Sequence, residues 1–394
     1  MPERGLQRRI ADVGFSPVTA SLGLAFVLVA AIILATGENP LGAYAEMWKG
    51  ATSGSGLRTV VNRAIPIVGM AIAISIPFRA GIINLGAEGQ MVVGGLAAAL
   101  TAIYVPGPGM LVIALAFLAG AVAGALWALI PALAQTALKL PILISSLLLN
   151  APARALTSYL VKYSFADKTA TSATTVEIPA TTKIPTLDWA SGSSATVFLL
   201  AVLVVAVSLF NNRTSPGYER YMSGLNLRFA RYGGVDVARQ TVSTMLAGGA
   251  IAGMVGAHLV LGQAFRFVDN DLAGTGFAWT GLLVTLLAAH RAIPALIAGF
   301  FFAALQVGGL AMQRSAGVSW QLAQVLQAVV ILALAMRVVI VRRRDPTSPT
   351  TPLASAAGQA RGSRPTPATA TTTATTSPTA IAGAASATGV RGSA

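Results

Sequence analysis

The chain has 394 residues, of which 55% are apolar and only 10% are charged. Soluble domains usually carry about 25% charged residues, so this composition excludes an ordinary soluble enzyme and a secreted protein. The absence of cysteine excludes disulfides, zinc–thiolate sites and thiol nucleophiles. The net charge of +14 indicates loop topology and contact with anionic membrane lipid, so we expect no nucleic-acid partner.

Long apolar stretches predict an all-α fold, a polytopic membrane helix bundle. The first stretch, near 18–36, follows Arg4, Arg8 and Arg9. It is longer than the apolar region of a signal peptide and lacks a small-residue cleavage site, which favours an uncleaved span. Further apolar stretches lie near 60–77, 82–104, 110–133, 141–161, 195–210, 241–262, 275–289, 293–312 and 320–341. We therefore expect about ten spans, with 275–289 short enough to be a partial one.

The distribution of basic residues predicts the sidedness of this bundle. With the N-terminus inside, roughly twice as many basic residues fall in cytoplasmic segments as in outer ones, which supports two cytoplasmic termini. Residues 1–345 would then form the transmembrane domain, with an outer loop at 163–194 and a cytoplasmic loop at 211–240. The tail, 346–394, is rich in Thr, Ala and Pro and is expected to be disordered.

Enzyme signatures are absent from the sequence. No G-x-x-x-x-G-K-[ST] motif occurs, so the chain has no phosphate-binding loop of the ATPase kind. Its two histidines, His258 and His290, lie far apart without a nearby acidic pair. We expect no catalytic residue, no cofactor and no metal site, and we expect His258 to pack within a helix.

A run of polar residues stands at the start of an apolar stretch: Asn84, Glu88 and Gln90. An ionised carboxylate at mid-bilayer costs roughly 2.5–3.5 kcal/mol, so Glu88 needs a partner, a water-filled cavity or a proton. Asn84 and Glu88 are four residues apart and would share one face of a helix. These residues would either line a translocation path or form a hydrogen-bonded knot that holds helices together.

A second polar set, Ser146 and Asn150, has the same spacing. Packing through interhelical hydrogen bonds is the favoured interpretation here, and Asn150 is a weaker candidate for the pathway. Arg154 is long enough to reach the membrane interface by snorkelling. The pairs of small residues, Gly120 with Gly124 and Gly249 with Gly253, predict helix-packing faces.

The loop at 211–240 combines five arginines with aromatic residues and glycines. Short helices are expected on either side of Gly224. Such a segment suits docking into a partner's groove, although an interfacial helix on anionic lipid would have a similar composition.

Four blocks, in order, resemble the ABC-transporter permeases for nucleosides and simple sugars, a group related to ribose-type and branched-chain amino-acid permeases. They are residues 78–90, residues 144–150, the loop with Gly224, Asn226, Ala230 and Gly234, and residues 274–277 through 318–320. The resemblance covers roughly 57–340. Two departures are the Leu140-Pro141-Ile142 turn, where the family often has a glutamate, and Leu227, where proline is usual.

The resemblance implies a subunit of an importer of the bacterial plasma membrane that does not itself hydrolyse ATP. An ATP-binding subunit would dock on the loop through Gly217, Gly224, Asn226, Ala230 and Gly234. A second permease subunit, identical or related, would complete the pathway, and an external solute-binding lipoprotein would deliver solute. Asn84, Glu88, Gln90 and Asn150 would line or brace the pathway. Nucleosides rank first as substrates and simple sugars second. The alternatives are an ion-gradient-driven secondary transporter and a scaffolding membrane protein.

Overall fold

The computed structural model describes residues 17–35, 37–187, 193–317, 319, 321–322, 324–325 and 327–329. The N-terminal arginines, most of the expected span at 320–341 and the whole tail at 346–394 lie outside these residues. The predicted positions of both termini therefore stay predictions.

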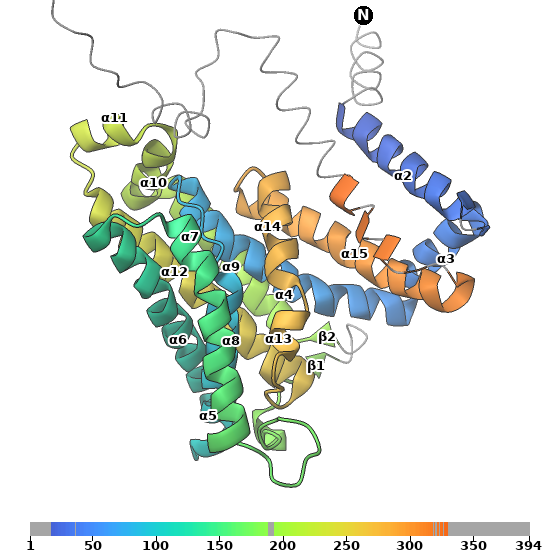
Figure 1. The fold of residues 1–394 in the computed structure, drawn as a ribbon, viewed down its shortest axis with the longest axis horizontal. Coiled ribbons are helices and arrows are strands. Elements are labelled where there is room, and N and C mark those ends of the chain that lie inside the picture. The colour runs from blue at the N-terminus through green and yellow to red at the C-terminus, as the bar shows by residue number, and fades with distance from the viewer. Residues whose placement is uncertain are drawn as a thin grey trace, which may run out of the picture. The chain divides into compact units, whose positions relative to one another are not determined.

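The described part of the chain is built almost entirely from helices (Figure 1). The first half contains α2 (Pro17–Ala35), α3 (Pro40–Thr52), α4 (Gly54–Arg79), α5 (Ala87–Tyr104), α6 (Gly109–Leu138), α7 (Ile142–Leu148), α8 (Asn150–Tyr159) and the π-helix η1 (Leu160–Ser164). The second half contains η2 (Ala180–Thr182), β1 (Thr186–Leu187), β2 (Ser193–Ser194), α9 (Thr196–Arg213), α10 (Ser215–Leu225), α11 (Leu227–Tyr232), α12 (Val237–Leu259), the π-helix η4 (Val260–Ala264), α13 (Asp271–Gly274), α14 (Phe277–Leu287) and α15 (Ala292–Ala316). The two short strands pair antiparallel, with Thr186 opposite Ser194.

The core is formed by α4, α5, α6 and α12: α12 packs against the other three, and α5 also packs against α6. Glycines let α6 and α12 approach to backbone contact: a Cβ added to Gly253 would clash with the carbonyl oxygen of Gly120 and lie 3.2 Å from Cα of Gly124. A Cβ added to Gly249 would lie 2.5 Å from the carbonyl oxygen of Gly124. The predicted small-residue packing faces are confirmed, since close backbone approach is how membrane helices gain contact area.

A second layer covers α4. Helices α14 and α15 both pack on it. The Thr285 hydroxyl in α14 donates a hydrogen bond to the Ala71 carbonyl (2.7 Å), and the ring of His290 lies 5.2 Å from that of Phe78. These contacts fix α14 alongside the second half of α4.

Two breaks interrupt the helical course. Residues 80–86 separate α4 from α5, with Gly81 at φ +77°, a conformation that costs glycine least. Residues 265–276 separate η4 from α14 and hold only the one-turn helix α13. Ala87, Glu88, Phe277 and Ala278 are all buried, so α5 and α14 both begin inside the bundle. The stretches expected at 60–77 and 82–104 are indeed separated, but the second helix begins only at Ala87, because the Asn84 side chain binds the N–H of Gly86 ahead of it.

Among the described residues, five helices are long and apolar enough to cross a membrane, or six if the bent pair α2–α3 counts as one span. The five are α4, α6, α9, α12 with η4, and α15. Other predicted stretches are present in interrupted form: 141–161 is divided at Leu149 into α7 and α8, and 275–289 holds only the 11-residue α14. The expected count of ten is therefore not reached by uninterrupted helices.

The segment after η1 is tied to the end of α12. Thr174 and Val268 form a β-bridge, and the N–H groups of Thr175 and Ile178 donate to the carbonyls of Phe267 and Phe265, each at 2.9 Å. Figure 1 shows this segment at the end of the bundle opposite α10 and α11. Residues 165–187, called here the cap segment, therefore close one end of the molecule.

We predict that Gly253→Leu destabilises the bundle, because a leucine side chain has no space between α6 and α12. Overpacking of this kind costs typically 1–3 kcal/mol, so the apparent Tm of the detergent-solubilised protein should fall by several degrees, measured by fluorescence-detected size exclusion after heating. The control is Gly23→Leu in α2, where nothing lies within 4 Å of the added Cβ. Equal Tm values for the two variants would contradict the close packing described.

Candidate functional site

The polar break at 80–86 is organised by Asn84. Its Oδ1 accepts from the N–H of Gly86 at 2.9 Å, and its Nδ2 donates to Oε1 of Gln90 at 3.2 Å. Asn84 and Gln90 are each only 1% exposed. The expectation that Asn84 and Glu88 share a helix face is wrong, because α5 begins at Ala87 and Asn84 lies in the break before it.

The second predicted polar set meets the first. The hydroxyl of Ser146 accepts from the N–H of Leu85 at 3.1 Å. Asn150 accepts from the N–H of Gly89 through Oδ1 and donates to the carbonyl of Leu85 through Nδ2, both at 2.9 Å. The α7–α8 junction thus provides hydrogen-bond partners for backbone groups that the break leaves outside any helix. This geometry favours the hydrogen-bonded-knot interpretation for Asn84, Ser146 and Asn150.

Glu88 has two partners from different helices. Its Oε1 lies 3.5 Å from Nη1 of Arg154 in α8, and the indole N–H of Trp279 in α14 donates to its Oε2 at 3.2 Å. Snorkelling alone therefore does not describe Arg154, whose side chain is 45% exposed but reaches the buried carboxylate. Arg154 therefore supplies the charged partner that the Glu88 carboxylate needs in order to lie within a membrane.

A small cavity adjoins this ion pair. It measures about 10 Å³, which is room for about one water molecule. Its lining residues come from α4, the break, α5 and α14: Ile74, Asn84, Leu85, Ala87, Glu88, Ala278, Trp279 and Leu282. This cavity therefore has no room for a larger solute in this conformation. We call Glu88, Arg154 and Trp279 the Glu88 cluster.

The loop at 211–240 folds into two short helices, α10 and α11, and packs on the end of α4; the helices are divided at Asn226, and Gly224, expected to separate them, lies in the last turn of α10. A Cβ added to Gly224 would clash with the carbonyl oxygen of Arg79, and one added to Gly81 would lie 3.3 Å from Cα of Gly224. The Arg79 guanidinium lies 5.3 Å from the centre of the Tyr221 ring. Backbone contact at Gly224 thus joins the loop to the break.

The other loop residues singled out have separate structural positions. Gly217 packs against the backbone of Phe210 and Asn211. Asn226 caps α11 through Oδ1, which accepts from the N–H of Phe229 at 3.1 Å. Ala230 is buried at 2% exposure, and Gly234 adopts φ +84° in the turn before α12.

Large side chains on these two helices remain uncovered. Tyr218, Phe229 and Tyr232 are 62%, 59% and 93% exposed. Arg228 and Arg231 are exposed beside them on α11. The loop therefore presents an aromatic and basic surface on the side away from its contact with α4.

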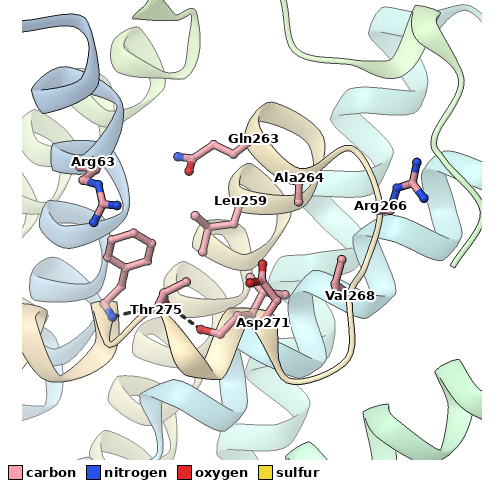
Figure 2. A pocket seen from close by; sticks show the side chains of 10 residues that line it. Arg63, Leu259, Gln263, Ala264, Arg266, Val268, Asp271 and Thr275 are labelled. Atoms are coloured by element: carbon pink, nitrogen blue, oxygen red, sulfur yellow. Dashed lines mark hydrogen bonds between the residues drawn. The ribbon is translucent and has the colours of Figure 1, made fainter. Parts of the chain in front are cut away.

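A larger cavity of about 190 Å³ opens near the other end of α4 (Figure 2). The sequence analysis did not single it out. We call it the outer pocket, and its lining residues are Arg63, Leu259, Gln263, Ala264, Arg266, Val268, Asp271, Leu272, Thr275 and Phe277. The signal that was available is the presence of Arg63 and Asp271 at the ends of apolar stretches, where a charge is easily taken for a loop residue.

Two charges of the outer pocket are not paired with each other. Nη1 of Arg63 contacts only the Gln306 amide oxygen, at 3.4 Å, and the Asp271 carboxylate has no ion pair or hydrogen bond to any described residue. Arg266 is engaged differently, since it pairs with Glu177 at 3.2 Å. Lys183 contacts the same carboxylate at 2.6 Å, and these two cations, Lys183 first, lower the pKa of Glu177.

His258 lies behind this pocket and is buried, as expected for a residue packed within a helix. Its Nδ1 lies 2.8 Å from the Thr196 hydroxyl, and its Nε2 lies 3.2 Å from the Gln263 amide nitrogen. Within the described ranges, no group of three His, Asp or Glu side chains gathers where it could hold a metal ion.

The chain is similar in sequence to several permease subunits of ABC transporters. Relatives include the glucose ABC transporter permease of Haloferax volcanii, 34% identical over 77% of this chain and 82% of the relative. The guanosine ABC transporter permease of Bacillus subtilis is 27% identical over 83% and 94%. The nucleoside ABC transporter permease of Lactococcus lactis is 26% identical over 80% and 89%. No solved structure matches the chain.

The family described as the permease component of branched-chain amino acid transport systems matches residues 56–335, which include the polar break, the loop and the outer pocket. The chain therefore belongs to this family of ABC-transporter permeases, as a multi-pass protein of the plasma membrane.

Proposed function

We propose that the chain forms the membrane pathway of an ATP-driven importer for nucleosides or simple sugars. The observation that carries the proposal is the Glu88 cluster, in which a buried carboxylate pairs with the half-exposed Arg154 beside a helix break whose backbone also contacts the loop at Gly224. Family membership and the substrates named for the relatives, glucose, guanosine and nucleosides, support the class of solute. Ten spans, one of them partial, and two cytoplasmic termini remain part of this proposal.

Three partners belong to the proposal. An ATP-binding subunit docks on the aromatic and basic surface of α10 and α11. A second permease subunit, identical or related, completes the pathway within the lipid. A solute-binding lipoprotein delivers solute to the opposite end, where the cap segment and the outer pocket lie. The distance between the outer pocket and the loop supports this assignment. Arg63 at the pocket and Arg79 at the loop are 16 residues apart on α4, about 24 Å along its axis.

The coupling follows from backbone contact. When the ATPase moves α10 and α11, Gly224 presses on Arg79 and Gly81, at the break. Near Leu85 the break has no helical hydrogen bonds to lose, because Asn84 and side chains of α7 and α8 bind its backbone, so it can shift without unwinding a helix. Helix α5, which begins at the break, carries Glu88 against Arg154 and Trp279. Movement of the loop therefore changes the distance between Glu88 and its partners, and solute shifts the balance only by its different affinity for the two states.

The geometry separates two roles among the four candidate pathway residues, Glu88, Gln90, Asn84 and Asn150. Glu88 lines the small cavity and contacts α14, so it is the residue that a passing solute meets. Gln90, Asn84 and Asn150 hold the break together and act as positioning residues. Helices that begin within the membrane, as α5 and α14 do, line binding sites in other transporters.

We predict that Glu88→Ala lowers ATP-dependent uptake about tenfold, a loss of roughly 1.4 kcal/mol, because Arg154 and Trp279 lose their shared partner. Uptake of labelled guanosine or glucose is measured in cells with matched membrane levels of the subunit. Glu46→Ala is the control, since Glu46 pairs only with Lys49 at 34% side-chain exposure.

The double variant Glu88→Ala/Arg154→Ala separates pairing from independent roles. If the two residues act as a pair, the double variant is no worse than the single one. Uptake that stays normal in Glu88→Ala would remove Glu88 from the pathway.

We predict that bulk in the loop uncouples the ATPase. Gly224→Leu separates the loop from Arg79, and Ala230→Arg places a charge at a buried position, so solute-stimulated ATP hydrolysis should fall at least several-fold. Hydrolysis is measured in the purified complex, with Gly233→Ala as the control because its added Cβ makes only ordinary contacts, the nearest at 3.4 Å. A complex that still co-purifies and responds to solute would rule out this docking surface.

A further inference from the structure

We propose that the outer pocket is a binding station for the polyhydroxylated ring of the solute, before the solute reaches the Glu88 cluster. This proposal rests on the proposed function and adds a site and a recognised chemical group to it.

The size of the pocket fits one ring. About 190 Å³ corresponds to the liquid volume of about six water molecules at roughly 30 Å³ each. A single sugar ring fills such a space, whereas a whole nucleoside would leave its base outside. The ring is also the part that glucose and nucleosides, the substrates named for the relatives, have in common.

The charges of the pocket select neutral solutes with hydroxyl groups. Arg63 offers donors from α4, and Asp271 offers acceptors from α13. Figure 2 shows Gln263 above the Leu259 side chain; its amide oxygen is the available acceptor, because its amide nitrogen contacts the Asn62 carbonyl and Nε2 of His258. An ion of either sign is attracted by one of these two charges and opposed by the other, while a neutral hydroxyl group donates to Asp271 and accepts from Arg63 at once. Vicinal hydroxyls can therefore contact both the half-buried Arg63 and the exposed Asp271, replacing the water that would otherwise solvate them.

Apolar side chains form the remaining wall. Leu259, Leu272 and Phe277 are 4%, 6% and 5% exposed. They offer a C–H surface to one face of a ring, while the polar groups contact its edge. Pockets for small solutes commonly combine an apolar lining with a few polar groups that fix orientation.

An apolar layer separates the outer pocket from the Glu88 cluster. Arg63 lines the pocket and Ile74 lines the small cavity, 11 residues further along α4, which is about 16 Å and close to the same helix face. Ile67 and Met70 lie between them and are fully buried. Along α4 the pocket and the small cavity are thus separated by buried apolar side chains, while on α14 their linings are adjacent, at Phe277 and Ala278.

The absence of cysteine from the chain provides a direct test. Thr275→Cys and Val268→Cys each place a single thiol in the pocket, and Thr169→Cys places one on the exposed cap segment. Intact cells that express the full transporter are treated with a membrane-impermeant maleimide, with or without guanosine, glucose or hypoxanthine. A pocket variant is used only if it retains uptake, and two positions are provided in case one does not.

We expect guanosine and glucose to slow labelling of the pocket thiol about fivefold or more, and hypoxanthine, which has no ring hydroxyls, to have no effect. Labelling of Thr169→Cys should not respond to any of them. Adding Asp271→Ala to the pocket variant should abolish protection, whereas Asp167→Ala, in the cap segment, should leave it intact.

Two results would overturn the site: unprotected labelling in a variant that still takes up guanosine or glucose, or protection by hypoxanthine equal to that by guanosine. Neither would touch the proposed function, because uptake continues in both. The proposed function itself fails if the unmodified transporter takes up neither solute in the presence of ATP.

Discussion

The structure depends on one constraint: a backbone that leaves helical geometry inside an apolar bundle must still find hydrogen-bond partners. Residues 80–86 meet it with side chains. Asn84 binds the N–H of Gly86, Ser146 binds that of Leu85, and Asn150 binds both Leu85 and Gly89. Because α7 and α8 supply these groups, the chain can stop α4 at one end of the bundle and begin α5 within it. The buried position of Glu88 is a direct consequence.

That arrangement links three parts of the molecule through short contacts. The loop helices reach the break through the backbone of Gly224, the break positions α5, and α5 places Glu88 between α8 and α14. A second break, before α14, has the outer pocket beside it. Both breaks therefore border a polar site, and the buried side chains of Ile67 and Met70 lie between those sites. Such an arrangement suits a pathway that opens at one end at a time.

Much of this could be predicted from the sequence. The apolar stretches predicted the positions of most described helices, and the glycine pairs that include Gly120 and Gly253 indicated close helix packing. The cost of burying a charge predicted that Glu88 has a partner. The partners themselves could not be predicted, because Arg154 and Trp279 are 66 and 191 residues away in sequence and only tertiary packing brings them together. Helix periodicity misplaced Asn84, since its side chain binds the N–H of Gly86 and the Gln90 amide from a non-helical position before α5. The outer pocket was missed because its lining joins Arg63 of α4 to the distant stretch 259–277, which carries no recognisable binding motif.

The central claim is that this chain is a passive gate, moved by nucleotide binding in a separate subunit. Flux of labelled guanosine and glucose into proteoliposomes tests it most directly. The account predicts uptake when the permease is reconstituted with its ATP-binding subunit and binding protein and supplied with ATP. It predicts none from the permease alone under a proton or sodium gradient. Gradient-driven uptake by the isolated permease would contradict it.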